Sequence, residues 1–498
     1  MTMAGARSLR ARARLLTGGT VLAAACAVAA CSGTGPASSS SAAGTGAGST
    51  GASTPAAQPP SAVPVPSTAG AGQGAATGPA AAWPQFNQNA ARTGVAAGLP
   101  AAGRLSTAWT AHLDGAVYGQ PLVVGGDVLA ATENDSVYAI DRATGKTVWR
   151  AHLGTPVPQQ DLNGCGDIFP LGITGTPVYD PGNGLVYAVA ETTGYQHVLF
   201  GLSVSDGTVR VRRDIDIASA ANQPAYNQQR PALAIDDGRV YAAFGGLFGD
   251  CGAYIGSVVG VPLSGSGALI SWHVPTSREG AIWGTAGPVT GPNGNLWVAV
   301  GNGAAGAGDP YDGSDSVTEL SPGLQRVGYF APTTWGSDND SDLDLGSTQP
   351  ALAAGNTAFI MGKGSVGYLL DTASLGGIGG QRAEQNICNA RGAAAVSGST
   401  VYEPCQDGGM AAIAVDAASK EIKVLWRGPA DADGSPVTGG GAVWVDGNGT
   451  LYELNPATGA VRQQTSVSAG LPHFSSLSLA GSSAYLATLD GITAVNGA

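Results

Sequence analysis

The stretch VYAIDRATGKTVWR, residues 137–150, has the pattern of two β-strands joined by a tight turn. Its first half alternates, so Val137 and Ala139 share one face of a strand and their neighbours share the other. The Asp-x-x-Thr-Gly segment that follows suits a turn, because aspartate can bond to nearby backbone and glycine accepts a positive φ. The second half brings in Trp149, a large aromatic side chain that a lone hairpin cannot bury. The hairpin must therefore pack against other parts of the chain.

Weaker copies of this hairpin recur along the chain, and each follows another hairpin that begins near a glycine or proline. The copies are residues 137–150, 198–213, 257–273, 316–330, 366–378, 411–427 and 450–464. Four short strands repeated every ~40–60 residues are the signature of a β-propeller. An eighth unit, which begins at Phe474, ends at Ala498 before a fourth strand, and residues 105–113 are similar to the outer strand of the first unit. We therefore predict an all-β fold, an eight-bladed propeller of four-stranded antiparallel blades closed by this N-terminal strand, with seven blades as the alternative.

The composition narrows the possible functions. The chain has 498 residues and a net charge of −12, and only 12% of its residues are charged. Because it has no basic stripe, nucleic acid is excluded as a partner. The 78 glycines and the 6% of aromatic residues suit many short strands with tight turns better than long amphipathic helices.

The N-terminus has the pattern of an export signal. Arginines precede an apolar run, residues 15–30, that is shorter than a typical transmembrane helix. The run is followed by Cys31 in the sequence Val-Ala-Ala-Cys, which resembles the bacterial lipobox and implies that Cys31 becomes the lipidated first residue after cleavage. An ordinary secretory signal with an incidental cysteine is the alternative. We predict a signal peptide over residues 1–30, a disordered tether rich in Ser, Ala, Gly and Pro over 31–82, and the propeller over 83–498.

Loop lengths distinguish the two faces of the predicted propeller. If the strands of a blade are named A to D from the channel outward, most A–B and C–D turns are short. The long segments are D–A connections and B–C loops, which share the opposite face: residues 154–174, 214–229 and 331–348, and residues 245–256 and 301–315. Long loops on a rigid scaffold are common places for binding sites. Neutral drift of loop length is the alternative explanation.

Four cysteines lie in the predicted propeller, an even set that suits disulfide formation in an exported protein. Cys388 precedes strand A and Cys405 follows strand B of one blade, so the two should lie opposite each other across the hairpin. The remaining pair is Cys165 with Cys251, which are both on the long-loop side of adjacent blades.

The repeats resemble those of the pyrroloquinoline-quinone (PQQ)-type β-propellers, in which the pattern Ala-x-Asp-x-x-Thr-Gly-x-x-x-Trp stacks the blades. The residues that carry this pattern in full are Ala139, Asp141, Thr144, Gly145 and Trp149. The sequence WPQFNQNAARTG, residues 83–94, is also similar to the lead-in of bacterial members. The resemblance implies the fold but leaves the function open, because quinoprotein dehydrogenases and an outer-membrane assembly lipoprotein share these repeats.

The quinoprotein dehydrogenases supply one function hypothesis. Residues 283–303 resemble the segment of those enzymes that provides a stacking tryptophan and a calcium-binding asparagine, with Trp283 and Asn302 at the matching positions. Asp344, or less well Asp342, matches their catalytic aspartate, which would act as a calcium ligand or proton acceptor. Against this, many such enzymes have a disulfide between adjacent cysteines, and no two cysteines are adjacent here.

We prefer a different expectation, a non-enzymatic binding or scaffolding lipoprotein of the bacterial cell envelope. It would be monomeric, anchored to the outer side of the cell membrane, and would hold a protein, peptide or glycan on its long-loop face. The alternative is a quinone-dependent alcohol or sugar dehydrogenase that uses calcium and PQQ. In that enzyme Asp344 would be catalytic, Trp283 would contact the quinone, and the metal ligands would be Asn302, Asp342 and Asp344.

Overall fold

A computed structural model describes residues 81–162 and 164–498. The predicted signal peptide, Cys31 and all but the last two residues of the predicted tether lie outside these residues. The described chain is almost entirely β-sheet, and its helical segments are short: η1 Gln159–Leu162, η2 Pro224–Tyr226, α1 Trp335–Ser341 and η3 Leu345–Ser347. None of the helices in the described part of the chain is long and apolar enough to cross a membrane.

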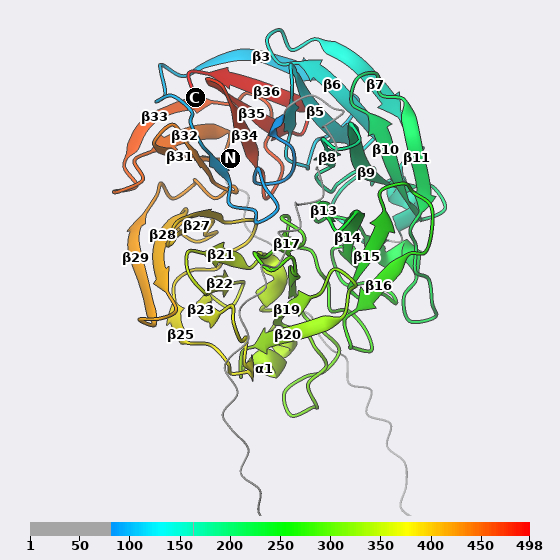
Figure 1. The fold of residues 1–498 in the computed structure, drawn as a ribbon, viewed down its shortest axis with the longest axis vertical. Coiled ribbons are helices and arrows are strands. Elements are labelled where there is room, and N and C mark those ends of the chain that lie inside the picture. Colours follow the sequence, from blue (N-terminus) through cyan, green and yellow to red (C-terminus); the bar gives the residue numbers. More distant parts are fainter. Residues whose placement is uncertain (1–80, 163) are drawn as a thin grey trace, which may run out of the picture. The chain divides into compact units, whose positions relative to one another are not determined.

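Eight antiparallel sheets, the blades, follow one another around a ring (Figure 1). Blade 1 contains β4 Leu122–Val124, β5 Asp127–Thr132, β6 Ser136–Asp141 and β7 Thr147–His152, and blade 2 contains β8 Val178–Asp180, β9 Leu185–Thr192, β10 Gln196–Ser203 and β11 Val209–Asp214. Blade 3 contains β13 Ala234–Asp236, β14 Arg239–Gly246, β15 Ser257–Pro262 and β16 Ile270–His273, and blade 4 contains β17 Val289–Thr290, β18 Leu296–Val300, β19 Ser316–Leu320 and β20 Arg326–Ala331. Blade 5 contains β21 Ala351–Ala353, β22 Thr357–Met361, β23 Val366–Asp371 and β25 Ala383–Asn386. Blade 6 contains β26 Ala395–Ser397, β27 Thr400–Glu403, β28 Ala411–Asp416 and β29 Glu421–Arg427, and blade 7 contains β30 Val437–Gly439, β31 Ala442–Gly447, β32 Thr450–Leu454 and β33 Val461–Ser466. The first strand of each blade is the innermost, strand A.

Blade 8 joins the two ends of the described chain. It contains β34 Leu477–Ala480, β35 Ser483–Thr488, β36 Gly491–Asn496 and, as its outer strand, the N-terminal β3 Ser106–His112. The pairing of β3 with β36 places Thr107 opposite Val495 and Ala111 opposite Ile492. The predicted eight blades and closing strand are therefore confirmed, and the seven-blade alternative is wrong.

The outer-strand tryptophan of one blade is buried by the C–D turn of the next blade. A Cβ atom added to Gly207, in the turn of blade 2, would lie 2.6 Å from the ring of Trp149 in blade 1. The Trp149 Nε1 donates a hydrogen bond of 2.9 Å to the Val204 carbonyl of the same turn. The same contact joins Trp109 to Gly145 and Trp426 to Gly459. The glycine and the tryptophan of the repeat thus meet across the boundary between blades, which is why both recur.

Blade 5 differs from the prediction. The predicted C–D hairpin, residues 366–378, contains strand C, but strand D is β25, five residues further on. The predicted outer strand is instead β24 Gly377–Ile378, which pairs in parallel with β20 of blade 4. Gly376, Gly377 and Gly379 all have positive φ, so the chain bends away from blade 5 before it returns as β25.

The segment that precedes the closing strand lies in the centre of the ring. It enters as β1 Ala81–Trp83, which pairs with β4, and leaves as β2 Val95–Ala96, which pairs in parallel with β30. Between them, backbone hydrogen bonds join Pro84 to Tyr179, Ala90 to Thr290, Thr93 to Val396 and Gly94 to Thr438, on the A strands of blades 2, 4, 6 and 7. Only a segment inside the channel can reach all of these strands. The sequence indicated a lead-in here but not its path.

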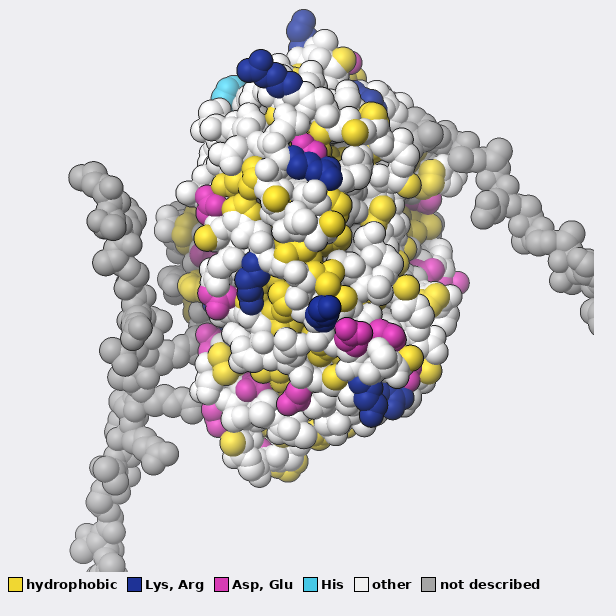
Figure 2. Space-filling model, turned by 90° about the vertical axis from the view of Figure 1, so that its left-hand side faces the viewer, with side chains coloured by type: hydrophobic (Ala, Val, Ile, Leu, Met, Phe, Trp, Pro, Cys, Tyr) yellow, Lys and Arg dark blue, Asp and Glu magenta, His cyan; other side chains and the backbone are white. Residues whose placement is uncertain are grey.

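The outer edge of the ring carries isolated apolar side chains. Figure 2 faces the side with β29 and β33 and shows hydrophobic side chains in an interrupted band between charged ones. Leu425 of β29 and Val461 of β33 are 44% and 43% exposed. Single exposed apolar residues are normal on the outer strand of a sheet. The features that could form a functional site lie on the loops instead.

Candidate functional site

The long connections emerge together at one end of the ring, which we call the long-loop face. It consists of the D–A connections and the B–C loops, and all four helical segments lie in D–A connections. The loops contact one another: the Asp167 carboxylate lies 3.5 Å from the His473 imidazole, and Asn302 bonds to Asp342. The opposite end carries the A–B and C–D turns and is called the short-turn face.

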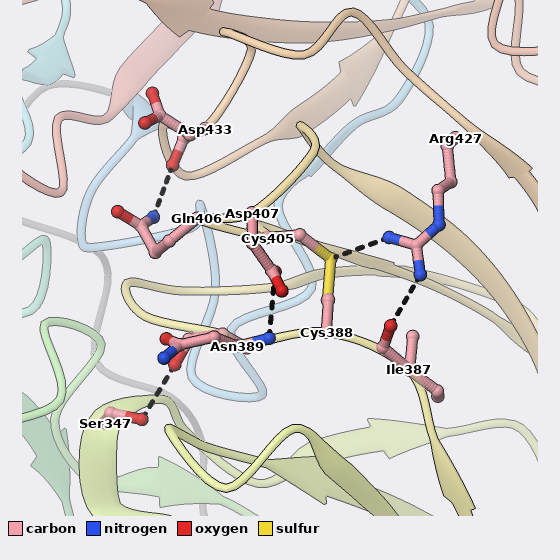
Figure 3. Close-up of a disulfide and its surroundings, with 10 residues drawn as sticks. Ser347, Ile387, Cys388, Asn389, Cys405, Gln406, Asp407, Arg427 and Asp433 are labelled. Carbon is pink, nitrogen blue, oxygen red and sulfur yellow. Dashed lines mark hydrogen bonds between the residues drawn. A yellow bond between two sulfur atoms is a disulfide. The ribbon is translucent and has the colours of Figure 1, made fainter.

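Both predicted disulfides are present and brace the long-loop face. Cys165–Cys251 joins the D–A connection before blade 2 to the B–C loop of blade 3. Cys388–Cys405 ties the two ends of the first hairpin of blade 6 (Figure 3). Beside this second bridge, Gln406 Nε2 donates a 3.3 Å hydrogen bond to the backbone carbonyl of Asp433, in the next D–A connection. The bridges hold neighbouring loops at fixed positions.

The residues that the sequence singled out for a quinone and calcium lie close together at the channel mouth on the long-loop face. The Asp344 Oδ1 accepts a 2.7 Å hydrogen bond from the Asn302 backbone, and the Asp342 Oδ1 accepts one of 2.9 Å from the Asn302 Nδ2. Asp342 ends α1 with a φ of 57°, which turns the chain back toward β18. Trp283 lies beside this group, with its ring centroid 5.5 Å from the Lys363 ammonium.

Lys363 is the residue of this group that the sequence did not indicate. Its ammonium forms ion pairs with Asp344 and with Asp342, the latter at 3.0 Å. Burial lowers the pKa of Lys363, but the two carboxylates outweigh burial and raise the pKa above its ordinary value. The ammonium is therefore a permanent cation between the two aspartates.

An aromatic stack extends this group across the channel mouth. The Phe474 ring lies 6.0 Å from the Trp283 ring and 4.8 Å from the Arg230 guanidinium. His473 meets the edges of Phe474 at 5.1 Å and Tyr118 at 5.3 Å. The residues that directly precede the A strands surround the channel mouth, and Arg230, His473 and Phe474 are three of them. Aligning the blades on their A strands would have indicated these residues from the sequence.

This geometry decides how well a calcium–quinone pair fits. Calcium requires six to eight oxygen ligands, whereas the two aspartates here already hold an ammonium group. Within residues 81–162 and 164–498, no three His, Cys, Asp or Glu side chains converge as a metal site. The small cavity of about 10 Å³ at the channel mouth lies beside Arg230, His473 and Phe474, and none of the residues singled out for the quinone and calcium lines it. As they lie, these residues fit an internal ion pair and not calcium with a quinone.

A larger cavity opens beside the channel mouth. A groove of about 530 Å³ runs across the long-loop face between the B–C ends of blades 6 and 7 and the connection to blade 8. Its lining includes Gln406, Asp433, Asn448 and residues 467–475. The groove has the volume of a ligand site and shares His473 and Phe474 with the channel mouth.

The fold and these features define an eight-bladed β-propeller with an elaborated long-loop face, and comparison with known proteins shows what it is similar to. Residues 99–247 match the family model of the outer membrane protein assembly factor BamB. No curated protein sequence matches the chain. The family-model match and the repeat pattern support the PQQ-like β-propeller family for the chain.

Solved structures of both functional kinds share the fold. Quinohemoprotein alcohol dehydrogenase from Comamonas testosteroni has a TM-score of 0.64 at 14% identity, covering 83% of this chain and 80% of that one. A europium-containing methanol dehydrogenase has a TM-score of 0.62 at 15% identity, covering 84% and 98%. BamB from Moraxella catarrhalis has a TM-score of 0.52 at 15% identity, covering 79% and 97%. At such identities the likeness concerns the fold alone.

Proposed function

We propose that the chain is a binding or scaffolding module of the bacterial cell envelope that holds its partner on the long-loop face. The groove carries this proposal. Its volume of about 530 Å³ suits a ligand, whereas packed side chains leave only about 10 Å³ at the neighbouring channel mouth. Because the blades and disulfides fix the loops before binding, little conformational entropy is lost when a partner docks.

The proposal includes a lipid anchor at Cys31 on the outer side of the membrane. The lipobox-like sequence supports the anchor, and two disulfides suit an oxidising compartment. The described chain begins with Ala81 opposite Val124, next to the A–B turn of blade 1. This turn belongs to the short-turn face. The described chain therefore enters the ring at the end opposite the groove.

Photocrosslinking in intact cells tests the proposal. A photoreactive residue at Ser468, exposed in the groove, should crosslink to an envelope component, while one at Asn356, exposed on the short-turn face, should not. A Cys31→Ser chain with the same probe should leave the membrane fraction and lose the crosslink. Crosslinks from Asn356 alone, or continued anchoring of the Cys31→Ser chain, would contradict the proposal.

The dehydrogenase alternative has its own assay. With added calcium and PQQ, the purified chain should not reduce a dye in the presence of alcohols or aldoses, because Lys363 occupies the space between Asp342 and Asp344. Turnover that disappears in Asp344→Asn would make the chain an enzyme and overturn the proposed function.

A further inference from the structure

The groove on the long-loop face is built from four short segments that the blades hold side by side. Gln406 comes from the B–C loop of blade 6 and Asn448 from the B–C turn of blade 7. Asp433 lies in the D–A connection before blade 7, and residues 467–475 form the connection before blade 8. The Cys388–Cys405 bridge stands next to Gln406 and fixes this wall of the groove (Figure 3).

The charges that line the groove favour an uncharged ligand over an anionic one. Among the residues that line it, Asp433 is the one acidic residue, and neither Lys nor Arg is present. Burial, followed by the charge of Arg230, lowers the pKa of His473 to about 4, so its imidazole is neutral at ordinary pH. A phosphate, a uronic acid or an acidic peptide would therefore meet the Asp433 carboxylate, and the nearby Arg230, which packs on Phe474, is not among the residues that line the groove.

Uncharged polar groups dominate the rest of the lining. The amides of Gln406 and Asn448 and the hydroxyl of Ser468 can each donate and accept hydrogen bonds. Gly447 lets the B–C turn of blade 7 pack closely against the connection before that blade, because a Cβ atom there would lie 2.9 Å from the Asp433 Oδ1 and would collide with the Asp431 carbonyl. This close packing holds the Asp433 segment beside Asn448 in the lining of the groove.

One ring in the groove is held in place. The His473 imidazole is 37% exposed, and edge contacts with Tyr118 and Phe474 fix its orientation. The groove thus combines a fixed flat ring with a carboxylate and two amides in one lining. A pyranose has matching surfaces, with hydroxyl groups at its edge and C–H groups on its face. The apolar side of Leu471 adds to the same wall.

We infer that this groove binds a neutral oligosaccharide, with Asp433 and Asn448 accepting or donating hydrogen bonds to its hydroxyls and His473 packing on a sugar ring. The inference rests on the proposed function and names the class of ligand for the same face. A volume of about 530 Å³ suits a di- or trisaccharide. A basic peptide is less well matched, because most of the polar lining is uncharged.

Titration calorimetry of the full chain with maltotriose, cellotriose, chitotriose and mannotriose tests the inference. At least one of these should bind. Asp433→Asn should weaken binding about tenfold, because it replaces a charge-assisted hydrogen bond with a neutral one. Asn448→Gly should weaken binding too, and glycine accepts the φ of 46° at this position, so the turn keeps its shape. The matched control is Asn356→Ala, in a second open cavity of about 380 Å³ on the short-turn face, which should bind as the wild type does.

Thermal unfolding of each variant first establishes that it is folded. Failure of all four trisaccharides to bind, binding that both groove variants leave unchanged, or loss of binding in Asn356→Ala would each overturn the inference. So would an oligolysine peptide that binds in place of the sugars and depends on Asp433. A crosslink from Ser468 combined with any of these results would leave the proposed function standing, so the two failures are distinguishable.

Discussion

Buried carboxyl groups lie at or just beyond the ends of B strands, beneath the long-loop face. Glu133 and Asp135 follow β5, Glu191 is in β9, Glu403 is in β27 and Asp446 is in β31. Burial raises the pKa of Glu133 to about 8, that of Asp135 to about 8 and that of Asp446 to about 6. Neither carboxylate oxygen of Asp135 has a hydrogen-bond partner. The ionised form is costly in such a place, so the fold favours the protonated one.

These shifts predict that the protein becomes less stable as pH rises from about 4 to about 8. The pKa of Asp135 is 3.8 in an unperturbed chain and about 8 in the fold, so the native state holds a proton that the unfolded state has lost. The free energy of unfolding must then fall with rising pH across this window, by about 1.4 kcal/mol per pH unit for each such group. Urea unfolding at pH 5 and pH 8 measures the difference.

Two amide variants assign the effect to buried groups. Asp135→Asn removes one of the titrating carboxyls and should reduce the loss of stability between pH 5 and pH 8. Asp141→Asn is the matched control: hydrogen bonds from Thr144 lower the pKa of this turn aspartate, so it is ionised throughout the window in both states. Equal stability of the wild type at the two pH values would contradict the prediction.

At the scale of elements, the contact between blades is a tryptophan against a glycine. Gly207 has a φ of 71°, and a Cβ atom added there would lie 2.6 Å from the Trp149 ring. Gly207→Ala should therefore destabilise the protein twice, through a strained φ and by ~1–3 kcal/mol of overpacking. Gly194→Ala in the same blade shares the positive φ of 84° but has no atom within 4 Å of an added Cβ, so it isolates the strain. Thermal unfolding should rank the wild type above Gly194→Ala and Gly194→Ala above Gly207→Ala, and equal losses would contradict the role of the ring.

The elements that the sequence predicted are those with local signals. Alternating side chains and short turns mark the hairpins, with the Asp-x-x-Thr-Gly turn complete in the first of them. The likeness of residues 105–113 to the outer strand of blade 1 revealed the closure. The outer strand of blade 5 was not predicted correctly, because it follows a glycine-rich loop and carries no tryptophan. The site was predictable in part: Asn302, Asp342 and Asp344 do meet, but Lys363 reaches them from the next blade. The groove could not be predicted from the sequence, because its residues come from four separate loops that meet only in the folded ring and share no motif.

At the scale of the whole molecule, the ring depends on its N-terminal residues in two ways. Residues 84–94 fill the channel, where Phe86, Asn87 and Arg92 are all buried. Further along, β3 covers the edge of β36, and Trp109 packs on Gly145 of blade 1. The first contribution is core packing, and the second removes the unpaired sheet edge at which propellers would otherwise associate.

Three truncations separate these contributions. A chain that begins at residue 81 keeps every described contact and should melt at the temperature of the full chain. A chain that begins at residue 98 keeps β3 but empties the channel, so it should remain monomeric and melt at a lower temperature, because the buried Phe86, Asn87 and Arg92 are lost. A chain that begins at residue 114 also loses β3, which leaves the backbone groups of β36 unpaired, and it should associate increasingly as its concentration rises. Size-exclusion chromatography with light scattering and thermal unfolding give both readouts. If the chain from residue 114 stays monomeric and melts with the chain from residue 98, the closing strand contributes nothing and the ring is held by its other joints.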